Sequence, residues 1–150
     1  MLQKDIDRFN KKDIENKRFW LRLGGMPEVN GSVVLDIGCG HGGLCIDLAL
    51  SGAKKVIGLD INHQLIEFAR ENLRVNYPHL QDIVEFESIN LKNYHNNLIY
   101  DYIFSKDSFE HIIHVEEMLN EMKKNPNPVE RFMLDLVPFT TVLMEHIWKE

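Results

Sequence analysis

The hydrophobic positions of this chain change their period several times between residues 30 and 122. Short apolar runs alternate with longer stretches in which apolar residues recur every three or four positions. The short runs predict strands, and the longer stretches predict helices. Strands that alternate with helices at this spacing predict βαβ units. The expected fold class is therefore α/β, with a doubly wound, mostly parallel sheet that carries helices on both faces.

About five strands are expected. Val33 to Ile37, Lys55 to Asp60 and Tyr100 to Ser105 are rich in apolar residues and lie next to glycine or polar loops. Val84 to Ile89 alternates apolar with acidic residues, which predicts an edge strand with one solvent-exposed face. A fifth strand is expected at Arg131 to Val137.

Helices are expected between these strands. Leu44 to Leu50 is apolar on nearly all sides, as expected of a helix packed against the middle of a sheet. Asn62 is a suitable N-cap for a helix from His63 to about Val75. The buried face of that helix is expected to carry Leu65, Ile66, Ala69 and Leu73. A further amphipathic helix is indicated by Val115, Met118, Leu119 and Met122.

Residues 1–150 are expected to form a single domain with three parts. Residues 1–25 predict one N-terminal helix that ends at a Gly-Gly pair, with Ile6, Phe9, Trp20 and Leu21 along one stripe. Residues 30–122 form the motif-bearing core. The segment 125–150 begins with Asn-Pro-Asn-Pro and has room for at most one strand and one last helix, the latter over Phe139 to Trp148.

Composition narrows the class of protein. A chain of 150 residues with 44% apolar and 27% charged residues fits one ordinary globular domain. No apolar run reaches the length of a membrane span, and the first residues do not form a signal peptide. The two cysteines, Cys39 and Cys45, make neither a disulfide framework nor a metal site. We therefore expect a cytoplasmic protein with no metal and no membrane partner.

The charge balance bears on the partners of the chain. Seventeen basic residues stand against 23 acidic ones, and the formal net charge is −6. A protein that follows a phosphate backbone usually shows a basic excess. The balance favours a small or weakly charged substrate and predicts no nucleic-acid partner.

Residues 33 to 50, VVLDIGCGHGGLCIDLAL, join a strand to a helix through a glycine-rich loop. Gly38, Gly40 and Gly43 fit the pattern G-x-G-x-x-G, and Asp60 follows about twenty residues later at the end of the next strand. Taken alone, this pattern is typical of dinucleotide sites, in which the acidic residue binds ribose hydroxyls. S-adenosylmethionine also contains adenosine, so Asp60 supports either ligand.

The charge of Asp36 distinguishes between a dinucleotide and S-adenosylmethionine as the ligand of this loop. It lies two residues before the first glycine of the loop, where a dinucleotide would place its doubly charged pyrophosphate. S-adenosylmethionine instead brings an ammonium and a sulfonium to this position. One pair of unit charges near 4 Å is worth about 4 kcal/mol at an effective dielectric of about 20, before desolvation. The sign of this charge favours S-adenosylmethionine.

Over roughly residues 30 to 122, the sequence resembles the class I S-adenosylmethionine-dependent methyltransferases. LDIGCGHGG is similar to the glycine-rich first motif of that family, and VIGLDIN to its acidic second motif. YDYIFSKDSFEHI is similar to the fourth-strand motif. The resemblance implies a Rossmann-like sheet, normally of seven strands, of which this chain is expected to lack the last ones. It also implies S-adenosyl-L-methionine as the cofactor.

The resemblance also implies which residues bind the cofactor. Asp36, Gly38, Gly40 and the backbone of Cys39 would line the methionine end of the cofactor. Asp60 would hold the ribose hydroxyls, and Ile61 would lie against the adenine face. Ser88 and Ile89 would lie at the adenine edge, and Ser105 and Lys106 would close the pocket.

The chemistry requires little more than a well-held cofactor. Methyl transfer depends mainly on positioning, and a base is needed only where the acceptor must lose a proton. His41, Asp107 and His111 are near the expected pocket, and no catalytic base is assigned among them. The Asn/Asp-Pro-Pro-aromatic loop and the Pro-Cys nucleophile of nucleic-acid methyltransferases are absent. A small-molecule acceptor is therefore expected.

Two other functions remain open. The chain could be a non-catalytic, truncated Rossmann-like module that binds the cofactor or a partner protein, or an NAD(P)-binding fragment. Missing strands would leave a sheet edge exposed, and exposed edges favour pairing with a second chain. A homodimer through that edge is therefore also predicted.

Overall fold

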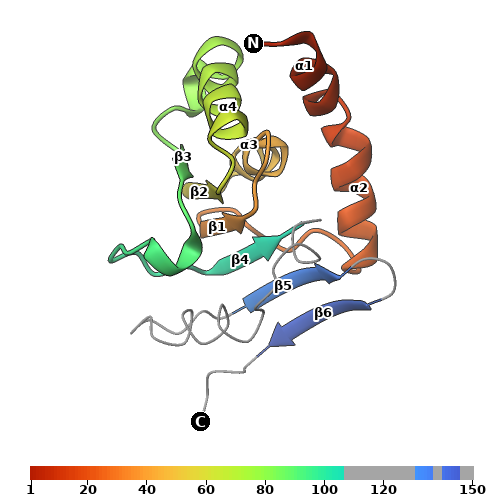
Figure 1. Ribbon diagram of the computed structural model, residues 1–150. Helices are drawn as coiled ribbons and strands as arrows, with labels where there is room; N and C mark the ends of the chain where they lie inside the picture. The colour runs from red at the N-terminus through yellow and green to blue at the C-terminus, as the bar shows by residue number, and fades with distance from the viewer. Residues whose placement is uncertain (107–130, 137–139, 146–150) are drawn as a thin grey trace.

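A six-stranded sheet organises the computed structural model, which describes residues 1–106, 131–136 and 140–145 (Figure 1). The strands are β1 (Val33–Ile37), β2 (Lys55–Asp60), β3 (Val84–Ser88), β4 (Tyr102–Ser105), β5 (Arg131–Leu136) and β6 (Thr140–Glu145). Their order across the sheet is β3-β2-β1-β4-β5-β6. β3, β2, β1, β4 and β5 run parallel, and β6 is antiparallel to β5. The predicted α/β class with a mostly parallel sheet is confirmed.

The four N-terminal strands lie where the hydrophobic pattern predicts them. β3 is an edge strand, as its alternation indicates. Val84 and Phe86 are buried, whereas Glu85 and Glu87 are exposed. β4 begins two residues later than expected, at Tyr102.

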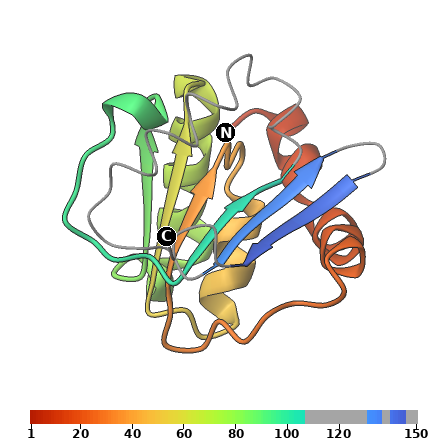
Figure 2. The same cartoon turned by 90° about the horizontal axis from the view of Figure 1, so that it is seen from below.

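The described helices are α1 (Gln3–Phe9), α2 (Lys12–Arg22), α3 (Gly43–Leu50) and α4 (His63–Asn76), with short 3₁₀ turns η1 (Pro78–Leu80) and η2 (Leu91–Asn93). α3 and α4 cover one face of the sheet, and α2 lies alongside α3 (Figure 2). Val56 and Ile57, neighbours on β2 that point to opposite faces, are 0% and 1% exposed. Both faces of the central strands are therefore buried. The helix expected near residues 115–122 lies outside the described residues.

The start of α4 follows the predicted capping. The Asn62 side chain accepts hydrogen bonds from the backbone N–H groups of Gln64 and Leu65, at 3.0 and 3.4 Å. It satisfies donors that a helix N-terminus otherwise leaves unpaired. Ile66 and Leu73 on the predicted apolar face are buried. This cap begins α4 three residues after β2 ends.

The single N-terminal helix expected over residues 1–25 is wrong in two respects. The chain forms two helices, α1 and α2, with a break at Asn10 and Lys11. Phe19 is fully buried, whereas Leu21 is 70% exposed. Phe19 and Trp20 pack their rings against Phe104 of β4. That contact fixes the rotation of α2 and turns Leu21 towards solvent.

The C-terminal segment also differs from its prediction. The strand expected at Arg131 to Val137 is confirmed as β5, but the expected helix over Phe139 to Trp148 is wrong, because β6 occupies residues 140–145. β6 starts with two threonines and a valine, which favour strands, and it pairs with β5 along its whole length. The described sheet therefore has six strands, one fewer than the usual seven. Within the described ranges, no helix is both long and apolar enough to cross a membrane.

Candidate cofactor site

The carboxyl ends of the parallel strands meet along one edge of the sheet. From β1 the chain passes to β2 and β3 on one side and then returns to β4 on the other side of β1. Ligands of doubly wound sheets bind outside the carboxyl ends of the strands at such a switch point. The crevice expected here lies beyond Ile37 and Ser105. The buried Ser105 hydroxyl donates to the Ile37 carbonyl oxygen at 3.1 Å, so this side chain joins β4 to β1.

The glycine loop leaves β1 with its backbone held against β2. The N–H groups of Gly38 and Cys39 both donate to the Leu59 carbonyl oxygen, at 2.8 and 3.0 Å. Gly38 and Gly40 have φ angles of 74° and 53°. These angles lie in the left-handed region that glycine adopts without a steric penalty. The loop therefore turns tightly enough to bring its backbone to the switch point.

Gly42 and Gly43, at the end of this loop, are required by close packing against neighbouring side chains. Gly42, rather than Gly43, has a positive φ, of 79°. A Cβ on Gly42 would lie 2.5 Å from a ring carbon of Phe86, so a larger residue does not fit between loop and core. A Cβ on Gly43 would lie 2.8 Å from the Cβ of Lys12, where α2 crosses the start of α3. Close packing, in addition to ligand approach, requires glycine here.

Asp60 is fixed at the end of β2 by backbone donors. Its Oδ2 accepts from the Gly40 N–H at 2.9 Å, and its Oδ1 accepts from the Asn62 N–H at 2.8 Å. Each carboxylate oxygen has two acceptor positions, so each retains one for a ligand hydroxyl. The glycine loop and the start of α4 therefore orient the carboxylate, and its free lone pairs suit a pair of ribose hydroxyls.

The predicted adenine positions lie together on the far side of β2. Ile61, directly after Asp60, is 77% exposed. Ser88 is the register partner of Asp60 on β3, and the Ile89 N–H donates to the Asp60 carbonyl oxygen at 3.0 Å. The structure brings these residues to one end of the β2–β3 pair. An exposed apolar side chain beside a ribose-binding carboxylate is suited to a flat aromatic base.

Asp36 is a buried carboxylate with an unsatisfied oxygen. It is 1% exposed, its Oδ2 accepts from the Cys45 thiol at 3.3 Å, and its Oδ1 has no hydrogen-bond partner in the described part of the chain. Burial raises the pKa of Asp36 to about 6, although the Cys45 hydrogen bond and the charge of Lys106 act in the opposite direction. An ammonium, directly or through one water, would supply the missing donor. Asp36 therefore fits the positive end of S-adenosylmethionine.

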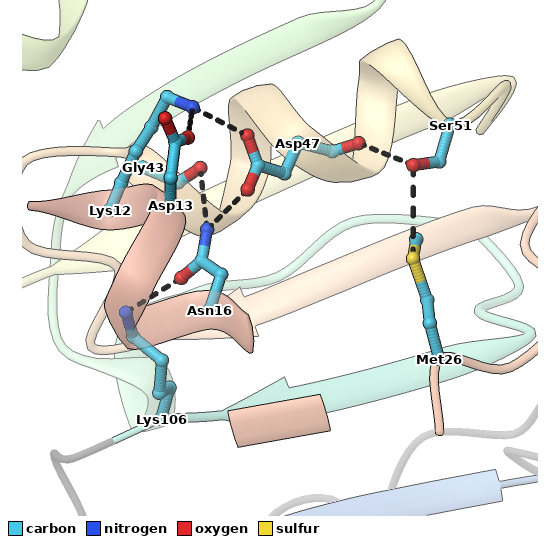
Figure 3. Close-up of polar contacts among 8 residues, drawn as sticks. All are labelled: Lys12, Asp13, Asn16, Met26, Gly43, Asp47, Ser51 and Lys106. Atoms are coloured by element: carbon cyan, nitrogen blue, oxygen red, sulfur yellow. Dashed lines mark hydrogen bonds and ion pairs between the residues drawn. The ribbon is translucent and has the colours of Figure 1, made fainter. Parts of the chain in front are cut away.

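Lys106 lies beyond β4 and is held by α2 (Figure 3). Its ammonium donates to Asn16 Oδ1 at 2.8 Å and lies 3.7 Å from a Glu15 carboxylate oxygen. Asn16, which is 2% exposed, also donates to Asp47 Oδ2 and to the Gly43 carbonyl oxygen. The sequence does not predict the roles of Asn16 and Asp47, because no local spacing links α2, α3 and the end of β4. A single polar residue on a predicted helix does not indicate which distant residues it contacts.

Of the three candidate bases, only His41 lies in the described residues. Its Nε2 is 3.2 Å from Asp5 Oδ1, and its ring packs edge-on against Phe68 at 5.2 Å between centroids. His41 therefore joins the glycine loop to α1. Asp107 and His111 lie outside the described residues. No group of three potential metal ligands occurs within the described part of the chain.

A groove of about 490 Å³ lies between α2 and α3, away from the strand ends. Its lining includes the apolar residues Trp20, Leu21, Met26 and Leu50 and the polar residues Asn16 and Asp47. None of the residues predicted to bind the cofactor lines it. It is therefore distinct from the crevice at the switch point.

Solved structures of similar fold come from several methyltransferases. An S-adenosylmethionine-dependent methyltransferase of Listeria monocytogenes, described as putative, matches with a TM-score of 0.64 at 25% identity, over 79% of this chain and 54% of that one. The magnesium protoporphyrin IX methyltransferase of Synechocystis PCC 6803, with bound S-adenosylmethionine, matches with a TM-score of 0.62 at 25% identity, over 96% and 66%. The shared fold includes the sheet that forms the candidate site.

Sequence comparison leads to the same group of proteins. The ribosomal protein L11 methyltransferase of Caldanaerobacter subterraneus subsp. tengcongensis is 39% identical over 64 residues, which are 43% of this chain and 20% of the relative. The matched segment thus spans about a fifth of that relative. A family model described as a methyltransferase domain matches residues 28–150. The chain belongs to this family of methyltransferase domains, which confirms the resemblance drawn from its motifs.

Proposed function

We propose that this chain binds S-adenosylmethionine at the carboxyl ends of β1, β2 and β4 and transfers its methyl group to a small-molecule acceptor. One observation carries the cofactor assignment: the buried carboxylate of Asp36 lies directly before the glycine loop and has an oxygen without a donor. Such a group prefers a cationic ligand, because ion pairing offsets the cost of burying the charge.

The same carboxylate disfavours NAD(P) in this loop. The pyrophosphate of a dinucleotide would approach the loop with two negative charges, and the buried carboxylate of Asp36 lies directly before that loop. Like charges at short range in a partly buried site oppose binding. The NAD(P)-binding alternative is therefore less well supported than the methyltransferase assignment.

The residues of the chain hold and orient the reactants. The cofactor, when bound, supplies a methyl group that its sulfonium already activates. Asp60, itself fixed by two backbone donors, would hold the ribose hydroxyls, and Ile61 would pack against the adenine. Asp36 would hold the ammonium of the amino-acid portion. Fixing the cofactor at these points restricts where an acceptor atom must lie for in-line attack.

A small-molecule acceptor is proposed from the charge of the chain and the missing nucleic-acid motifs. Relatives differ in their named acceptors: one is named for ribosomal protein L11 and another for magnesium protoporphyrin IX. The net charge of −6 disfavours an acidic polymer such as nucleic acid. A protein acceptor is the principal alternative.

Isothermal titration calorimetry tests whether S-adenosylmethionine is the cofactor. We expect micromolar binding of S-adenosylmethionine and S-adenosylhomocysteine and no binding of NADH or NADPH. Asp60→Ala should weaken binding of the first two at least tenfold. Asp82→Ala, which removes an exposed carboxylate of the same type elsewhere on the surface, should leave binding unchanged. Binding of NADH or NADPH alone would contradict the assignment.

A second experiment tests the acceptor. The protein is incubated with S-adenosylmethionine labelled in its methyl group and with separate small-molecule, protein and nucleic-acid fractions of a cell extract. Label is expected in the small-molecule fraction. Label transferred only to protein would refute the small-molecule acceptor while leaving the cofactor assignment intact.

A further inference from the structure

We propose that Lys106, held in place by Asn16, binds the α-carboxylate of the cofactor and thereby makes the site selective for a nucleoside that carries a complete amino acid. The inference rests on the proposed function, because it assigns a role within the same site. It extends that function by naming a recognised group and a positioning residue on α2.

The ammonium of Lys106 does not use all of its N–H donors within the described part of the chain. A lysine ammonium carries three N–H groups. In the described part of the chain, one hydrogen bond uses them, the bond of 2.8 Å to Asn16 Oδ1. Glu15 lies at 3.7 Å and shares its charge with Arg8, which is 2.9 Å from its other oxygen. The Lys106 side chain is only 15% exposed, so solvent does not fully compensate the remaining donors.

The orientation of Asn16 is determined by its surroundings. Its amide nitrogen faces two acceptors, Asp47 Oδ2 at 2.6 Å and the Gly43 carbonyl oxygen at 3.3 Å. Only the amide NH₂ group can donate to both, so the amide oxygen must face Lys106. Asn16 therefore connects the first turn of α3, directly after the glycine loop, to the residue that follows β4. The ammonium is held at one position relative to that loop (Figure 3).

Lys106 and Asp36 lie near each other at the switch point. Asp36 of β1 is the register partner of Phe104 of β4, and Lys106 follows Phe104 by two residues. The positive charge of Lys106 also acts to lower the pKa of Asp36. Among the described residues, no direct hydrogen bond or ion pair joins them. A cation and an anion that interact without contact offer complementary ends to a zwitterion. The amino-acid portion of the cofactor has that pattern: its ammonium suits Asp36 and its carboxylate suits Lys106.

The test compares two ligands that differ by one group. Decarboxylated S-adenosylmethionine lacks the carboxylate but keeps the ammonium, the sulfonium and the adenosine. Calorimetry is carried out with both ligands on the wild-type chain, Lys106→Met, Asn16→Ala and Lys17→Met. Lys17→Met is the matched control, because it removes the same charge from an exposed position on α2.

The wild-type chain and Lys17→Met should prefer S-adenosylmethionine over its decarboxylated form at least tenfold. Lys106→Met should abolish that preference by weakening only the first ligand, and Asn16→Ala should reduce it severalfold. A preference that survives Lys106→Met, or an equal loss for both ligands, overturns the role of Lys106 and leaves the cofactor assignment standing. Binding of neither ligand by the wild-type chain overturns the proposed function and this inference together. Thermal unfolding of each variant shows whether the fold is retained, and Lys106→Met alone suffices if Asn16→Ala fails to fold.

Discussion

The two ends of the candidate site are built in different ways. At the ribose end, Asp60 is held by Gly40 and Asn62, which lie within twenty residues of it along the chain. At the amino-acid end, Lys106 is held by Asn16, ninety residues away, through a helix that also contacts α3. The ribose end therefore follows from one continuous strand-loop-helix-strand segment. The amino-acid end exists only once α2 has packed on the sheet, and it should be the more sensitive end to changes at the N-terminus.

The largest effect on stability is expected from Gly42→Ala, which introduces a side chain into the glycine loop that orients Asp60 at the ribose end. The new Cβ would meet Phe86 at 2.5 Å while the backbone stays at a φ of 79°. Steric overlap and backbone strain together should cost about 3 kcal/mol of the free energy of unfolding. Gly40→Ala is the matched control, because its φ is also positive but its Cβ would have open space. Denaturant unfolding should give about 1 kcal/mol for that variant, and equal losses would refute the packing explanation.

Asp36→Asn should raise the stability of the chain and lower its affinity for the cofactor. Burial raises the pKa of Asp36 from 3.8 to about 6, so above pH 6 the folded chain carries an ionised group that opposes folding. Removing the charge should raise the free energy of unfolding at pH 7.5 by at most about 3 kcal/mol, and the gain should vanish below about pH 4. Affinity for S-adenosylhomocysteine should fall at the same time. A variant that loses stability at pH 7.5 would show that the carboxylate is already well compensated without a ligand.

The amino-acid end should also show a pH dependence that the ribose end lacks. An ammonium binds the ionised form of Asp36, whose pKa lies at about 6. Affinity for S-adenosylhomocysteine should therefore fall about tenfold between pH 7 and pH 5, measured by calorimetry. 5′-Methylthioadenosine, which has no ammonium, should bind equally at both values. The same dependence for both ligands would place the titrating group elsewhere.

The smallest effect is expected from Asn62→Ala. This substitution removes the cap of α4 and should cost about 1 kcal/mol of stability. The Asn62 backbone N–H still donates to Asp60, so the ribose carboxylate keeps its orientation. Thermal unfolding should shift, whereas affinity for S-adenosylhomocysteine should change less than threefold. A large loss of affinity would mean that the cap, in addition to the backbone, determines the ribose end.

The same contrast explains what the sequence could predict. β1, the glycine loop, α3 and β2 were predictable because their spacing and turn residues are local. The Asn62 cap and the edge position of β3 were predictable for the same reason. By contrast, the roles of Asn16 and Asp47 depend on contacts between distant elements. For β6 the apolar spacing at Val142 and Leu143 suits a helix or a strand, and pairing with β5 decides between them.

A crystal structure of the chain with S-adenosylhomocysteine is the decisive test of the proposed cofactor site. We expect the ribose hydroxyls within hydrogen-bonding distance of the Asp60 carboxylate and the amino-acid portion between Asp36 and Lys106. Ligand bound instead in the groove between α2 and α3, or bound at the strand ends with its ribose away from Asp60, would contradict it.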